Sequence, residues 1–162
     1  RRQRQMCIRD RLQTARQLSR LLDGFYNTLA WQALTRELIL NDEQFLHRFL
    51  AYLTKVNLID QPMSLEKRGL ILYEFCKQNY PEYQIQAAIA WIEAGMSLKK
   101  LPAEKVWTKR QIPPATWNII YGEYKESLRL CFLPADEKGE HGYWFGFESE
   151  IQKASPVFKA RT

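Results

Sequence analysis

The chain has 162 residues, of which 46% are hydrophobic and 13% aromatic, a composition typical of a folded domain rather than a disordered chain. The formal net charge is +6, but residues 1–11 supply +4 of it, with five arginines against one aspartate, so the remainder is nearly neutral. Since no apolar run approaches the roughly 20 residues of a membrane-spanning helix, and no signal peptide is visible, we expect no membrane contact and a cytoplasmic location.

Residues 1–11 read RRQRQMCIRDR and have neither a capping residue nor an apolar face. The string is similar to the translated read-through of a sequencing adapter, which turns up at the ends of proteins predicted from assembled short reads. We therefore predict an unstructured, artefactual tail and treat residues 12–162 as a single domain. The alternative is a basic arm that contacts phosphates.

Apolar residues recur at helical spacing over residues 12–112, the helical part of the predicted domain. The predicted helices cover approximately residues 12–22, 28–40, 41–56, 64–78 and 81–95, with a weaker one at 102–110. Asp23 and Gly24 would end the first helix, and Ser64 would cap the fourth. The apolar side chains of the fourth helix spread most of the way round it, so we expect it to be central.

Residues 126–160 change to the period of two that is typical of strands. One strand is predicted from residue 127 to 133, and an aromatic return strand at 143–147 follows a polar loop. Residues 155–160 would add a third strand at an edge, where a proline is tolerated. The predicted fold class is thus α+β: five to six helices in an antiparallel, bundle-like arrangement, followed by a small antiparallel β-sheet.

Two sets of residues are candidates for a chemical site: a group of polar residues in one loop, and the three cysteines. The loop before the return strand has four groups suited to a hard cation or to acid–base chemistry: Asp136, Glu137, Glu140 and His141. Because Lys138 and Gly139 interrupt them, a solvated loop is the better interpretation. The three cysteines, Cys7, Cys76 and Cys131, are too widely spaced for a typical metal site. We therefore predict no catalytic, cofactor-binding or metal-binding residue.

A basic stretch over residues 99–110 includes Trp107, and nucleic-acid-binding proteins also combine basic and aromatic residues in this way. Glu104 interrupts the stretch, however, and the connection within the helix pair at 41–78 is too long for a helix-turn-helix. The sequence therefore argues against nucleic-acid binding. A free-standing helical module that binds nucleic acid or a protein partner remains the alternative function.

Two stretches together resemble a known family. They read LLDGFYNT at residues 21–28 and SLEKRGLILYEF at residues 64–75. In this order they are similar to the C-terminal domain of unknown function of cobalamin-binding radical S-adenosylmethionine (radical SAM) proteins. The resemblance covers about residues 12–160.

In that family a Rossmann-like cobalamin domain and a partial barrel, with a Cys-x3-Cys-x2-Cys motif for an iron–sulfur cluster, precede the helical domain. The resemblance implies that this chain is a non-catalytic C-terminal accessory fragment without the barrel. Its parent would use an iron–sulfur cluster, S-adenosylmethionine and cobalamin, none of which is expected in the fragment. The partner would be the barrel of the same parent chain. We expect Phe25, Tyr26 and Asn27 to face that barrel, leaving an apolar patch exposed here.

Overall fold

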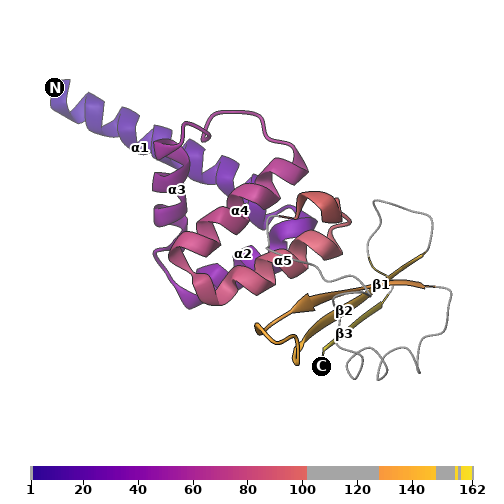
Figure 1. Ribbon diagram of the computed structural model, residues 1–162. Coiled ribbons are helices and arrows are strands. Elements are labelled where there is room, and N and C mark those ends of the chain that lie inside the picture. The colour runs from indigo at the N-terminus through magenta and orange to yellow at the C-terminus, as the bar shows by residue number, and fades with distance from the viewer. Residues whose placement is uncertain (1, 102–127, 149–155, 157, 162) are drawn as a thin grey trace. The chain divides into compact units, whose positions relative to one another are not determined.

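A computed structural model describes residues 2–101, 128–148, 156 and 158–161 (Figure 1). The chain forms two compact units, Arg1–Tyr83 and Gln84–Thr162, where the sequence predicted one domain. Pro81 lies just before this division and lacks the N–H that would continue the helical hydrogen bonding. The helix predicted at 102–110, and with it Glu104 and Trp107, lies outside the described residues.

In its described part, the first unit contains four α-helices, α1 (Arg2–Leu21), α2 (Leu29–Asn41), α3 (Phe45–Lys55) and α4 (Leu65–Asn79). A π-helical turn, η1 (Leu22–Tyr26), joins α1 to α2, and a short 3-10 turn, η2 (Pro81–Tyr83), follows α4. The Oγ of Ser64 accepts a hydrogen bond from the N–H of Lys67 at 3.2 Å, which confirms the predicted cap.

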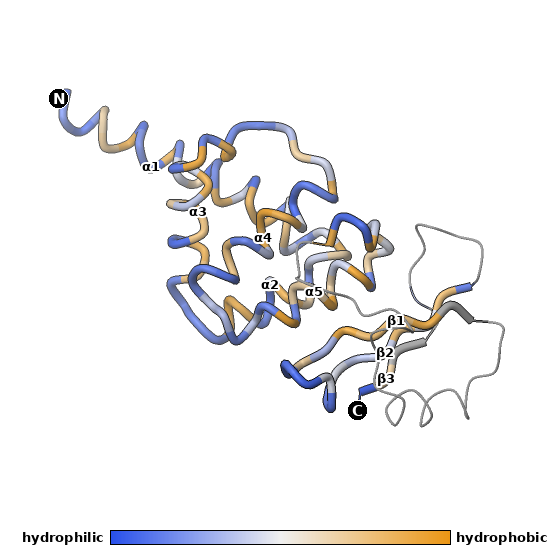
Figure 2. Tube along the Cα trace, viewed as in Figure 1, coloured by the Kyte–Doolittle hydropathy of each residue, from blue (hydrophilic) through white to orange (hydrophobic). Residues whose placement is uncertain are grey.

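The helix α1 includes residues 2–11, so the prediction that they lack regular structure was wrong. Arginine, glutamine and methionine all favour helix, and the packed end of α1 near Leu21 supplies a formed turn from which the helix continues. Residues 2–16 are nevertheless all exposed, and this segment extends beyond the other helices of the unit (Figure 1). In Figure 2 its start is mainly blue, the colour of hydrophilic residues. The artefactual origin of residues 1–11 stays a prediction.

Aromatic rings form the core of the first unit. The ring of Phe49 lies 4.9 Å from that of Phe25, 5.5 Å from that of Phe45 and 4.8 Å from that of Phe75, measured between centroids. All four side chains are at most 1% exposed. Such pairs contribute roughly 0.5–1.5 kcal/mol each beyond the burial of their area. As expected of a central helix, α4 buries six residues: Gly69, Ile71, Leu72, Tyr73, Phe75 and Cys76.

In the second unit, α5 (Gln84–Glu93) and the 3-10 turn η3 (Leu98–Lys100) precede three described strands. Gly95 ends the helical segment with a φ of 73°, in the left-handed region that glycine adopts readily. The strands β1 (Leu128–Pro134), β2 (Gly142–Glu148) and β3 (Phe158–Arg161) form an antiparallel sheet in the order β1-β2-β3. Opposite each other in β1 and β2, Phe132 and Trp144 are both fully buried.

The structure confirms the predicted fold class, a helix-rich α+β fold with a small antiparallel sheet near the C-terminus, and it confirms the third strand. None of the helices within the described residues is long and apolar enough to cross a membrane.

Candidate functional site

A cleft with a volume of about 440 Å³ opens in the first unit beside η1. Its walls come from the end of α1 and from η1, from residues 59–63 in the loop after α3, and from Leu53 and Arg68. We call it the η1 cleft. It brings together parts of the two stretches, 21–28 and 64–75, on which the family resemblance depends.

The polar residues of the first stretch fix the π-helical turn. The N–H of Asn27 donates to the carbonyl of Leu22 at 2.8 Å, which closes the wide turn. The side-chain amide of Asn27 donates to Asp23 Oδ1 at 2.9 Å, and the hydroxyl of Thr28 donates to the carbonyl of Asp23 at 2.9 Å. Single π-helical turns are rare and are often found at functional sites. This turn directs Phe25 into the core and leaves Gly24 beside the cleft.

Arg68 extends from the first turns of α4 to Gly24. A Cβ atom on Gly24 would lie 3.4 Å from Nε of Arg68 and 3.7 Å from its Cζ, so the guanidinium packs directly beside the glycine. Within the described part of the chain, the guanidinium of Arg68 makes no hydrogen bond or ion pair. A half-buried guanidinium with free N–H groups is well suited to an anionic ligand.

The second arginine of the cleft differs from Arg68 because it has a partner. Arg20 Nη1 lies 2.7 Å from Asp60 Oδ1, and the side chains are 64% and 60% exposed. An ion pair as exposed as this adds little to stability, since water competes for both charges. The pair nevertheless neutralises one positive and one negative group at the cleft, which leaves Arg68 and Asp23 as its remaining charged residues.

The three residues expected to face a missing barrel differ in their exposure. Phe25 is 1% exposed and contacts Phe49, so its ring offers no surface to a partner. Tyr26 is half-buried, and Asn27 is exposed. The large apolar side chains that are exposed within the described residues belong to α1, to α2 and to the residue after α3: Met6, Ile8, Leu12, Leu29, Leu40 and Val56.

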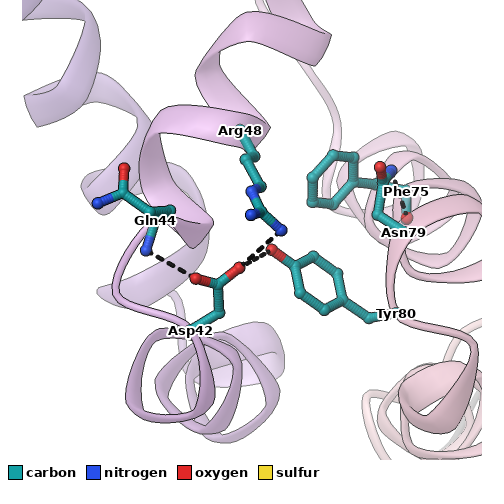
Figure 3. A network of polar contacts seen from close by, with 6 residues as sticks. All are labelled: Asp42, Gln44, Arg48, Phe75, Asn79 and Tyr80. Carbon is teal, nitrogen blue, oxygen red and sulfur yellow. Dashed lines mark hydrogen bonds and ion pairs between the residues drawn. The ribbon is translucent and has the colours of Figure 1, made fainter.

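A polar network elsewhere in the unit joins the start of α3 to the end of α4 (Figure 3). The hydroxyl of Tyr80 donates to Asp42 Oδ2 at 2.7 Å, and Arg48 Nη1 lies 3.1 Å from the same oxygen. The N–H of Gln44 donates to Asp42 Oδ1 at 2.9 Å. Since every oxygen of this carboxylate is occupied by the protein itself, we interpret the network as structural.

The ionisation of this network follows from its contacts. The hydrogen bond from Tyr80, then that from the N–H of Gln44, and the charge of Arg48 lower the pKa of Asp42 against a smaller opposing effect of burial. Burial, followed by the hydrogen bond to Asp42, raises the pKa of Tyr80 to about 12. At neutral pH the pair is therefore a carboxylate that accepts from a neutral phenol.

In the loop between β1 and β2, the first carboxylate has a structural role. Asp136 accepts hydrogen bonds from the N–H groups of Glu140 and His141, both at 3.0 Å. Partial desolvation acts to raise the pKa of Asp136, but these bonds and one from Gly139 outweigh it, so the pKa is lowered. The turn is thus organised by its own aspartate, a local signal that the sequence analysis missed.

The three thiols differ in their burial. Cys76 and Cys131 are buried, and Cys7 is exposed. Burial, and to a lesser degree the charge of Glu82, raises the pKa of the Cys76 thiol to about 12, as expected for a cysteine among apolar side chains. Among the residues with described structure, no three or more His, Cys, Asp and Glu side chains gather into a group that could hold a metal ion.

Comparisons with protein-family models, with curated proteins and with solved structures find no match to this chain. The η1 cleft is therefore defined by its geometry alone. Sequence reasoning overlooked Arg68 because its partner surface is a glycine, which has no side chain to reveal the contact. The available signal was the Asp-Gly pair at 23–24, which was interpreted only as a helix end.

Proposed function

We propose that this chain is the non-catalytic C-terminal accessory domain of a cobalamin-binding radical SAM enzyme, and that it contacts the catalytic barrel of the same parent chain. One observation carries the proposal. The two stretches that resemble the family are separated by more than thirty residues in the sequence, yet Gly24 of the first lies against Arg68 of the second. This contact supports one shared surface for the two stretches rather than two unrelated packing patterns.

The exposure of the residues next to η1 supports a contact with the barrel at this surface. Phe25 is buried and cannot contact a barrel. The proposed interface therefore consists of Tyr26, Asn27 and the nearby Leu29, which is 87% exposed at the start of α2. A single exposed leucine is common on protein surfaces. Its place two residues after Asn27 is what connects it to the proposed interface.

The sequence of the intact gene tests the parentage. Long-read sequencing of DNA from the same source should show an open reading frame that continues upstream into a Cys-x3-Cys-x2-Cys motif. A start codon near Leu12 would instead favour the free-standing module. The iron–sulfur cluster, S-adenosylmethionine and cobalamin belong to the other domains of the proposed parent, so stoichiometric iron in the purified 162-residue chain would also contradict the proposal.

The interface can be tested in the full-length parent with two matched variants. A protease site inserted before Leu12 allows the accessory domain to be cut from the barrel, and size-exclusion chromatography then shows whether the two parts stay together. Leu29→Asp should release the domain, since it places a charge in an apolar contact. Leu40→Asp, at the opposite end of α2 and 77% exposed, should not. If the wild-type parts separate after cleavage, the proposed contact is excluded.

A further inference from the structure

We infer that the η1 cleft binds a small organic monocarboxylate, with Arg68 as the residue that receives the carboxylate group. The inference rests on the geometry of the first unit and does not depend on the parentage proposed above.

The charge of the cleft selects the ligand. The guanidinium of Arg68 presents N–H donors in a planar fork that matches the two oxygens of a carboxylate. Arg20 is less available because Asp60 lies 2.7 Å from it. Asp23, a carboxylate, also lines the cleft and accepts a hydrogen bond from the side-chain amide of Asn27. A ligand with one carboxylate at Arg68 is therefore favoured, whereas a second carboxylate would be repelled.

The walls of the cleft suit an apolar body on the ligand. The lining of the cleft includes the apolar side chains of Leu21, Phe25, Ile59, Pro62 and Met63. The volume of about 440 Å³ is within the range, roughly 300–1,000 Å³, that small-molecule sites occupy. A short aliphatic chain would be removed from water here while its charged end contacts Arg68.

The guanidinium of Arg68 packs against Gly24. The position that a Cβ on residue 24 would take lies 3.4 Å from Nε, an ordinary contact distance that leaves room for a methyl group but not for a long side chain extending towards the guanidinium. A larger side chain at this position would displace Arg68 from the cleft without removing its charge. The glycine therefore positions the arginine.

Hexanoate is a suitable probe, and hexanamide is its neutral control of nearly equal size. Titration of the ¹⁵N-labelled full chain by NMR should give saturable shifts at the amides of Gly24 and Arg68 with hexanoate, and weaker ones with the dicarboxylate adipate. Hexanamide should bind at least about tenfold more weakly, because it has no negative charge and only one acceptor oxygen, so the two-point ion pair with the guanidinium is lost. Equal binding of hexanoate and hexanamide, or no saturable binding of hexanoate, would overturn the inference.

Variants separate the role of Arg68 from general effects of charge. Arg68→Gln should weaken hexanoate binding by roughly tenfold or more, whereas Arg36→Gln, on the exposed face of α2, should leave it unchanged. Arg68→Lys should retain part of the affinity, because it keeps the charge but not the fork. Gly24→Leu should weaken binding with Arg68 still present. Circular dichroism confirms folding of each variant, and unchanged affinity in folded Arg68→Gln would exclude the site.

Discussion

Arg68 lies against Gly24, so closely that a Cβ on the glycine would meet Nε of the arginine at 3.4 Å. This distance is an ordinary van der Waals contact, and the neighbouring atoms belong to the far end of a flexible side chain, so a methyl group requires no backbone movement. Gly24 does not have a positive φ, so alanine fits its backbone conformation. Gly24→Ala should therefore raise the free energy of unfolding by roughly 0.5–1 kcal/mol, because alanine reduces the freedom of the unfolded chain.

A second glycine provides the control for this prediction. Gly95 has a φ of 73°, so Gly95→Ala should lower the stability by roughly 1–2 kcal/mol. Urea denaturation, followed by NMR signals from each unit, measures both changes. A loss of stability for Gly24→Ala as large as that for Gly95→Ala would show that the packing around η1 has no room for one methyl group.

Tyr80→Phe tests the polar network around Asp42. The variant removes the hydroxyl that donates to Asp42 at 2.7 Å and keeps the buried ring. It should lower the stability of the first unit by roughly 1–3 kcal/mol at neutral pH, as expected for a hydrogen bond to a charged group. Tyr83→Phe is the matched control, since the hydroxyl of Tyr83 has no hydrogen bond within the described residues.

The same network predicts a pH dependence. The pKa of Tyr80 is raised from 10.0 to about 12, so its contribution is present below pH 10 and is lost as the pH rises towards 12. The pKa of Asp42 is lowered from 3.8, so its contribution is present above that pH and is lost as the pH falls through the lower value. The alkaline loss should be reduced in Tyr80→Phe relative to Tyr83→Phe. Equal alkaline loss in both variants would contradict the role of Tyr80.

The regular elements were predictable because each depends on local sequence. Phe45 and Phe49 follow the spacing of a helix face, Ser64 is a typical cap, and the strands alternate with a period of two. The contact between Gly24 and Arg68 was not predictable in this way, because it joins distant residues and one of them has no side chain. The prediction for residues 2–11 was wrong because the absence of a buried face was taken as the absence of a helix.

Gly142→Ala should disrupt the sheet of the second unit. A Cβ at this position would lie 2.4 Å from the carbonyl oxygen of Leu133 and 2.5 Å from Cζ of Phe132, and the first of these atoms belongs to the backbone. The ladder between β1 and β2 must shift to admit a methyl group, at a cost of roughly 1–3 kcal/mol. Hydrogen exchange at the amides of β1 should accelerate in this variant. Lys138→Ala, in the loop between the strands, should leave the exchange unchanged.

Deletion of residues 1–11 tests whether the basic start of α1 has a role. Residues 2–16 are exposed, so the deletion should leave the melting temperature of the first unit unchanged. It removes +4 of the +6 net charge, and the full chain should therefore elute from heparin at higher salt than a chain that begins at Leu12. Equal elution of the two chains would show that heparin binds a basic surface outside residues 1–11. That result would favour the alternative function, in which the rest of the protein binds nucleic acid. A lower melting temperature of the shorter chain would show that the start of α1 contributes to stability. That result would contradict the expectation drawn from its exposure.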